Sequence, residues 1–260
     1  MSAWGARQQV KYISSIILIA IVLAAYPVYK IFLDKKPSCF DGKQNQNEAG
    51  IDCGGVCQKI CQADSLIPIV LYARIFQIAP GSFSAVANIE NPNATLLAQN
   101  VPYSFKIYDS HDALIAEKYG ATFVPPNMIF PIFVGPLDTG NRIPAKVAFQ
   151  FENYPVWRKA SSSVPILKVL NENLTATDTA PHLEASLQNP TPYDLKNIEV
   201  IALIYDANNS LLAASRTVVD SLGRSQSAPL VFTWTAPFSA PVSRIDVVPN
   251  IPLADYIPNK

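Results

Sequence analysis

The chain has 260 residues, in which 20 basic residues balance 20 acidic ones and only 15% of all residues are charged. A chain with this balance lacks the strong positive field that recruits nucleic acid, so a nucleic-acid partner is not expected. Its 22 prolines against 10 glycines indicate a mainly β protein with many stiff turns.

The N-terminal region contains one long apolar run. Residues Tyr12 to Tyr29 carry no charge, and Ile31-Phe32-Leu33 extends the run. At about 1.5 Å per helical residue, the run nearly crosses a hydrocarbon core of about 30 Å, and a helix satisfies its backbone in lipid. We therefore expect a short tail at 1–11 and a transmembrane signal-anchor at 12–33. The alternative is a signal peptide cleaved near Leu23-Ala24-Ala25.

The cysteines decide on which side of the membrane the rest of the chain lies. Basic residues flank the apolar run almost equally, so the positive-inside rule does not settle the orientation. All four cysteines lie within 23 residues shortly after the run: Cys39, Cys53, Cys57 and Cys61. An even, clustered set favours disulfides in an oxidising compartment, whereas a four-thiolate zinc site on a cytoplasmic domain is the alternative. We expect a single-pass protein with a cytoplasmic N-terminus and an extracellular or periplasmic bulk.

The cysteine-rich segment 34–65, which we call the neck, is too short to bury a core of its own. Disulfides must therefore hold it together, each contributing on the order of 2–4 kcal/mol. Four cysteines allow three pairings, and the sequence alone does not choose among them. We favour the interlocked pairing, Cys39–Cys57 with Cys53–Cys61, because it would fix both ends of the loop 41–52. Adjacent pairing, Cys39–Cys53 with Cys57–Cys61, is the close rival.

Residues 39–61 resemble a small extracellular motif, C-x-D-G-x-x-N-x-x-E-x-x-x-D-C-G-G-x-C, that lies beside membrane anchors and between surface domains. Four oxygen-bearing side chains of the motif alternate with its turns: Asp41, Asn45, Glu48 and Asp52. Calcium binds six to eight such oxygens, so these four residues are candidate calcium ligands, and we expect no cofactor other than calcium. The alternative is that the same groups cap tight turns and hold no ion.

An internal repeat organises the rest of the chain. Asn91-Pro92 is followed by Tyr108-Asp109, and Asn189-Pro190 is followed by Tyr205-Asp206. The two series are offset by 97 to 98 residues, which is the size of a domain, so the pattern indicates a tandem duplication. We expect Asn-Pro to end a strand in each copy, and the aspartate to begin a turn by accepting hydrogen bonds from backbone N–H groups.

Each copy alternates apolar and polar residues, as from Phe83 to Glu90 and from Leu183 to Gln188. This period of two indicates strands with one buried face. Short strands and about 90 residues per copy indicate two tandem immunoglobulin-like antiparallel β-sandwiches. The expected domains after the neck are sandwich 1 at 66–153, a linker at 154–163, sandwich 2 at 164–250 and a C-terminal tail at 251–260. Trp157 in the linker is expected either to pack the sandwiches together or to stay partly exposed.

The repeated triplets resemble those of the FxLYD family of surface domains, an immunoglobulin-like sandwich in which a strand ends in a Leu-Tyr-Asp triplet. The triplets here are Ile107-Tyr108-Asp109 and Ile204-Tyr205-Asp206, with Phe105 and Ala202 at the position of the family's phenylalanine. The Asn91-Pro92 step is also similar to the water-stress (WHy) sandwich domains. This resemblance implies non-catalytic modules of the cell surface.

The sequence as a whole favours a non-enzymatic protein. The aspartates recur in both copies without a matching base or nucleophile, and the motifs of nucleotide-binding loops, zinc proteases and serine hydrolases are absent. We expect a membrane-anchored cell-surface protein with a structural, adhesive or assembly role, whose partner is another protein or a second copy of itself. The alternative is a module of the cell-envelope export machinery that binds a small ligand or a lipid.

Overall fold

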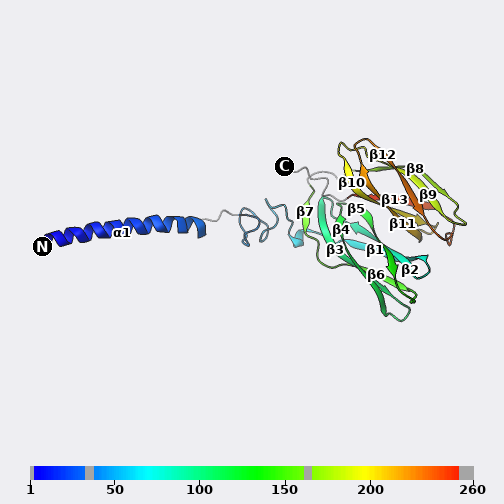
Figure 1. Ribbon diagram of the computed structural model, residues 1–260, viewed down its shortest axis with the longest axis horizontal. Coiled ribbons are helices and arrows are strands. Elements are labelled where there is room, and N and C mark those ends of the chain that lie inside the picture. The colour runs from blue at the N-terminus through cyan, green and yellow to red at the C-terminus, as the bar shows by residue number, and fades with distance from the viewer. Residues whose placement is uncertain (1–2, 33–37, 161–165, 252–260) are drawn as a thin grey trace. The chain divides into compact units, whose positions relative to one another are not determined.

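The computed structural model describes residues 3–32, 38–160 and 166–251 (Figure 1). The chain divides into two compact units, Met1–Cys57 and Gln58–Lys260. The first unit holds the helix α1 and most of the neck, and the second holds all thirteen strands of the described residues. Parts of the expected neck, linker and C-terminal tail, namely residues 34–37, 161–163 and 252–260, lie outside the described residues.

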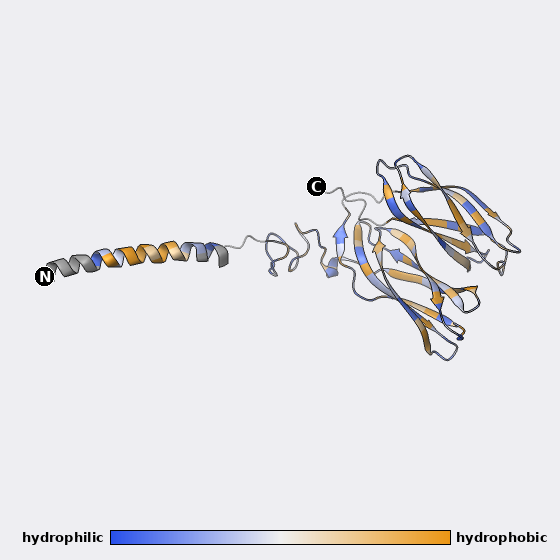
Figure 2. Cartoon of the chain, in the orientation of Figure 1, coloured by the Kyte–Doolittle hydropathy of each residue, from blue (hydrophilic) through white to orange (hydrophobic). Residues whose placement is uncertain are grey.

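The N-terminal helix α1 spans Ala3–Phe32. It begins well before the apolar run, so residues 3–11 of the expected tail are helical; they contain no proline that would stop the helix. Figure 2 shows the apolar run as a continuous hydrophobic stretch, and its described side chains are exposed. Across the described residues, no helix meets the combined length and hydropathy that crossing a membrane requires.

Sandwich 1 consists of two antiparallel sheets that enclose one core (Figure 1). One sheet has the strand order β1-β2-β5 and the other β4-β3-β6, with the short β7 paired to β3. Alternate residues of β2 and β3, such as Ile89 and Phe105, fill the core between the sheets. The strands are β1 (Ile69–Ala79), β2 (Ser82–Asn91), β3 (Leu96–Tyr108), β4 (Leu114–Val124), β5 (Met128–Asp138), β6 (Lys146–Phe151) and β7 (Trp157–Lys159).

Sandwich 2 has the same topology as sandwich 1. Its sheets are β8-β9-β12 and β11-β10-β13, which match β1-β2-β5 and β4-β3-β6 strand for strand. Tyr108 and Tyr205 end the matching strands β3 and β10, and a register shift immediately precedes each of them. The duplication read from the sequence is therefore present in the fold. The strands are β8 (Lys168–Thr175), β9 (His182–Gln188), β10 (Leu195–Tyr205), β11 (Leu211–Leu222), β12 (Ser227–Thr233) and β13 (Arg244–Asn250).

The limits of sandwich 1 differ from those expected. Trp157 lies in β7 and is 1% exposed within the core of sandwich 1, so it neither joins the two sandwiches nor belongs to a linker. Ile60 belongs to the same core, and its backbone N–H donates a hydrogen bond to the Trp157 carbonyl at 3.0 Å. A short 3-10 helix, Gln62–Asp64, follows. The C-terminal end of the neck is therefore part of this sandwich. The free energy gained by burying the apolar side chains of a tryptophan and an isoleucine favours this arrangement over one that leaves them in solvent.

The two sandwiches pack against each other through non-equivalent sheets. Val86 of β2 lies on the outer face of β1-β2-β5, and Ile201 and Leu203 of β10 lie on the outer face of β11-β10-β13. All three are buried in one cluster, together with Tyr72, Phe76, Phe133, Tyr205, Leu211 and Ala214. A hydrogen bond of 2.6 Å between the Tyr72 and Tyr205 hydroxyls crosses the same contact. We call this cluster the sandwich interface.

The repeat explains why these two faces meet. At the position of Leu203, sandwich 1 has Lys106, which pairs with Glu117 across 3.7 Å. At the position of Val86, sandwich 2 has Glu184, which is exposed. At these two positions, the faces that meet carry apolar residues, whereas the equivalent faces that do not meet carry charged ones. Hydrophobic burial therefore selects this pairing of sheets over the reciprocal one.

Replacement of Leu203 by lysine, the residue at the equivalent site of sandwich 1, should open the sandwich interface. Burying an unpaired ammonium costs several kcal/mol, so the two sandwiches should no longer unfold together. Calorimetry should then resolve two transitions in place of one. The matched control, Lys106→Leu, changes the same position in the other copy and should leave a single transition. A single transition in Leu203→Lys would contradict the interface.

The tyrosine pair makes the interface sensitive to alkaline pH. Burial, and then the hydrogen bond between the Tyr72 and Tyr205 hydroxyls, raises the pKa of Tyr72 above its ordinary value. Above about pH 10 the unfolded chain loses this proton while the folded chain keeps it, so the free energy of unfolding should fall as pH rises. In Tyr72→Phe, the part of this decrease in the free energy of unfolding that Tyr72 causes should disappear. Urea unfolding at pH 8 and pH 10.5 measures the difference; equal losses in both proteins would contradict the prediction.

Candidate functional site

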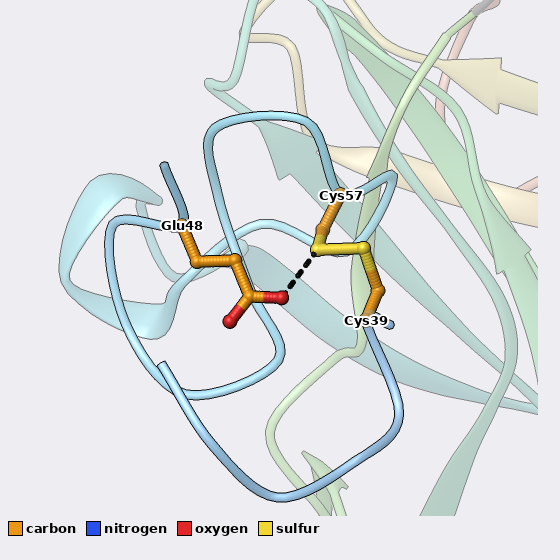
Figure 3. A group of neighbouring side chains, drawn as sticks. All are labelled: Cys39, Glu48 and Cys57. Atoms are coloured by element: carbon orange, nitrogen blue, oxygen red, sulfur yellow. Dashed lines mark hydrogen bonds between the residues drawn. A yellow bond between two sulfur atoms is a disulfide. The ribbon is translucent and has the colours of Figure 1, made fainter. Parts of the chain in front are cut away.

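The neck is held by two disulfides. Cys39 and Cys57 are joined, with their Cα atoms 5.7 Å apart (Figure 3). Cys53 and Cys61 are disulfide-bonded as well, and none of the four cysteines is free. The first bond leaves Cys53 and Cys61 to each other, which is the interlocked arrangement. The alternative, a four-thiolate zinc site, needs four free thiolates, and the oxidised cysteines do not supply them.

Glu48 is the buried carboxylate of the neck, at 6% exposure. One of its oxygens, Oε2, accepts hydrogen bonds from the backbone N–H groups of Asn45 and Asp52 at 3.2 and 3.3 Å. The other, Oε1, lies 3.1 Å from Cys57 Sγ, the contact dashed in Figure 3. A disulfide sulfur carries no hydrogen to donate, so this is an oxygen-to-sulfur contact. It places a carboxylate directly beside the Cys39–Cys57 bond.

The candidate calcium ligands act as acceptors within the neck. Asp41 Oδ1 accepts a hydrogen bond from the Lys43 N–H at 2.9 Å, and Asp41 Oδ2 accepts one from the Asn45 side chain at 2.9 Å. The Asn45 hydrogen bond lowers the pKa of Asp41. Asp52 accepts from the backbone N–H groups of Asp41 and Gly42 at 3.0 and 2.9 Å. These contacts are those of turn-capping carboxylates, the alternative reading of the four residues.

Within the described residues, the carboxylates of Asp41, Glu48 and Asp52 do not converge on a common point. The one metal-type cluster found there consists of Cys39, Glu48 and Cys57, and two of its three members are joined in a disulfide. Asn45 Oδ1 is buried without a hydrogen-bond partner. Calcium at Asp41, Asn45, Glu48 and Asp52 stays a prediction, and in the structure the carboxylates among them organise the turns.

The repeat-marker residues are structural in both sandwiches. Asn91 and Asn189 are buried, and each side-chain amide donates to backbone carbonyls of its own sandwich: Asn91 to Leu96 and Pro125, Asn189 to Tyr193, Leu222 and Gly223. Pro92 and Pro190 follow them directly and end the pairing of β2 and β9. These asparagines tie each strand end to its neighbouring loops, because a buried amide must find partners.

Asp109 and Asp206 begin identical turns. The Asp109 carboxylate accepts from the N–H groups of His111 and Ala113, and Asp206 accepts from those of Asn208 and Ser210. The Ala113 hydrogen bond, followed by the one from His111, lowers the pKa of Asp109. Both carboxylates serve as turn acceptors, which is the role expected of them.

A group of residues that the sequence did not single out lines a cleft beside the sandwich interface. Its members come from five segments, with Phe76, Ser84, Phe133, Arg216 and Trp234 as representatives. No local motif joins them, because they lie as far apart in the chain as β2 and the connection after β12. One signal was available: residues 200–205 of β10 read Val-Ile-Ala-Leu-Ile-Tyr, a strand apolar on both faces.

Comparisons with models of known protein families and with curated proteins gave no match. Among solved structures, a red sea bream transglutaminase is 14% identical, with 70% of this chain and 31% of that chain covered and a TM-score of 0.23. A β-glucuronidase from Bacteroides uniformis is 10% identical, with coverages of 68% and 25% and a TM-score of 0.28. This chain thus spans less than a third of either length.

A tandem CBM22 domain from Paenibacillus barcinonensis is 8% identical, with 70% of this chain and 83% of that chain covered and a TM-score of 0.17. At TM-scores this low, the three likenesses carry no argument about the fold or the activity of this chain.

Gly55 should be indispensable for forming the neck. A Cβ at this residue would lie 1.9 Å from the Asn47 carbonyl oxygen, and its φ is +56°. Gly55→Ala should therefore prevent Cys39 from reaching Cys57, leaving alkylatable thiols after oxidative refolding. Gly42→Ala is the matched control, because Gly42 has φ +72° but nothing within 4 Å of the added Cβ. It should cost only the left-handed strain of about 1–2 kcal/mol. Equal thiol counts in the two variants would contradict the packing.

Glu48 should slow reduction of the Cys39–Cys57 bond. Attack at Cys39 releases Cys57 as a thiolate beside a carboxylate, and two negative charges at this separation repel. Glu48→Gln removes the charge and keeps an acceptor oxygen, so reduction by dithiothreitol should become several-fold faster. Glu90→Gln, in the strand β2, is the control and should react as the wild type does. Peptide mapping of alkylated cysteines over time gives the rates; unchanged rates in Glu48→Gln would refute this role.

Proposed function

We propose that this chain is a membrane-anchored, non-enzymatic protein of the cell surface, with a structural, adhesive or assembly role carried by its two joined sandwiches. The observation that carries the proposal is the neck, in which all four cysteines are oxidised. Disulfides persist in oxidising compartments, so the neck points to a location outside the cytoplasm. The rest of the chain follows the neck without a further long apolar run.

The anchor is supported by the character of α1. Residues 16 to 19 are four consecutive apolar residues, Ile16, Ile17, Leu18 and Ile19, and each is more than half exposed. Four consecutive positions cover every side of a helix, at about 100° per residue. A helix that is apolar all round suits lipid better than water. The uncharged run from Tyr12 to Tyr29 is the proposed anchoring segment.

The sandwich modules support an architectural role. The Tyr-Asp turns and buried asparagines are repeated in both copies, which fits the proposed kinship with the FxLYD and WHy domains. Their aspartates accept hydrogen bonds from backbone N–H groups and so position loops. The two sandwiches share an apolar interface, which would let them act as one rigid surface module. A protein partner or a second copy of the chain is the proposed binding partner.

The test is the topology of the full chain in a bacterial host. Alkaline phosphatase, which is active only after export, is fused to the C-terminus, and a fluorescent protein active only in the cytoplasm is fused in a parallel strain. We expect phosphatase activity in a membrane fraction that resists carbonate washing. If the fluorescent fusion were fluorescent and the phosphatase fusion inactive, the proposal would be overturned.

Two variants separate anchoring from export. Ile17→Arg with Leu18→Arg places two charges in the apolar run and should abolish membrane association. Ile129→Arg changes an exposed apolar residue of β5 and should leave it intact. A shortened chain in the soluble fraction of the wild type would instead show a cleaved signal peptide and refute the anchor.

A further inference from the structure

A cleft of about 500 Å³ lies beside the sandwich interface, and its lining residues Trp234 and Phe238 pack against the core of sandwich 2. On one side it is bounded by the outer face of β1-β2-β5, and on the other by β11 and the connection that follows β12. Its volume lies in the range of sites that bind small organic ligands. The residues that matter for its chemistry are Ser84, Phe133, Ser215, Arg216, Trp234 and Phe238.

Ser84 gives the cleft an unpaired polar group. Its side chain is 1% exposed, and its Oγ has no hydrogen-bond partner. A buried hydroxyl without a partner costs about 1–3 kcal/mol, and such groups are rare in folded proteins. Gly135 lies opposite, where an added Cβ would come within 2.9 Å of Ser84 Cβ. The glycine therefore permits the close approach of β5 to Ser84.

Aromatic side chains form the apolar part of the cleft. Trp234 and Phe238 meet edge to face, with ring centroids 5.3 Å apart. The indole N–H of Trp234 donates to the Ala214 carbonyl at 3.3 Å, so the polar edge of the ring is already used. Phe133 lies under the guanidinium of Arg216, at 5.6 Å from the ring centroid. What remains for a ligand is mainly ring surface together with hydroxyl groups.

The charge of the cleft excludes strongly ionic ligands. No carboxylate is among the described residues that line it, and the one cation, Arg216, is paired with Glu199 at 3.1 Å. A peptide that adds a strand to the edge of β11 would need the backbone of Ala214, whose carbonyl already accepts the Trp234 N–H. The lining thus suits an uncharged ligand with one apolar face and several hydroxyl groups.

We infer that this cleft binds a short neutral oligosaccharide. A sugar ring presents a C–H face that packs on an aromatic ring and a rim of hydroxyls that exchange hydrogen bonds with serine and threonine. Trp234 and Phe238 supply the ring surface, and Ser84 supplies an acceptor and donor that has no other partner. The inference does not depend on membrane anchoring, since every residue it uses lies in the strand-bearing unit.

The test is a titration of the full chain in lauryldimethylamine oxide, a detergent without sugar. The probes are maltotriose, cellotriose and triacetylchitotriose, each taken to 10 mM and followed by tryptophan fluorescence. At least one should shift the emission saturably, and Trp234→Phe should remove the shift, because the other tryptophans are Trp4 and the core residue Trp157. No saturable shift with any of the three would overturn the inference, as would competition by an extended hexapeptide.

Two serine variants separate binding from folding. Ser84→Ala should weaken the affinity for the saccharide about five- to tenfold, which corresponds to the loss of one hydrogen bond. The same change should leave the melting temperature of the free chain equal or higher, because it removes an unpaired buried hydroxyl. Ser110→Ala, in an exposed turn, is the control and should alter neither quantity. Undiminished affinity in Ser84→Ala would contradict the assignment of this residue to the site.

Discussion

The contact between two outer sheet faces is the constraint on which the strand-bearing unit depends. Leu203 and Ile201 make β10 apolar on both sides, so one face fills the core of sandwich 2 and the other must be covered. Val86 and its neighbours on sandwich 1 cover it. The Tyr72–Tyr205 hydrogen bond and the ligand cleft both lie along this contact, and neither would exist if the sandwiches were separate.

The neck satisfies a different constraint, since a segment of this length cannot bury a core. Two disulfides replace the missing burial, and carboxylates close its turns by accepting backbone N–H groups. Glu48 links the two, because its carboxylate accepts hydrogen bonds from two backbone N–H groups and also lies against the Cys39–Cys57 disulfide. The residues that suggested a calcium site are thus engaged in holding the backbone.

Much of the fold could be predicted from the sequence because the duplicated turns have local causes. Asp109 and Asp206 accept hydrogen bonds from backbone N–H groups two and four residues further on, so their spacing carries the signal of the turn. The prediction that Trp157 lies in a linker was wrong because its burial depends on β3 and Ile60, which are distant in the sequence. No local pattern reveals these contacts. The sandwich interface was visible only as the two-sided apolar run of β10, set against the alternation of β3. The cleft unites residues from five segments, and their sequence neighbours give no hint of it.

The most direct measurement of the central claim is a set of methyl–methyl nuclear Overhauser effects in the full chain. Val86 belongs to sandwich 1, and Ile201 and Leu203 belong to sandwich 2; their methyl groups should give cross-peaks because all three lie in one buried cluster. These cross-peaks should vanish in Leu203→Lys while those within each core persist. Cores that give their own cross-peaks, with none between Val86 and Ile201 or Leu203 in the wild type, would contradict the account.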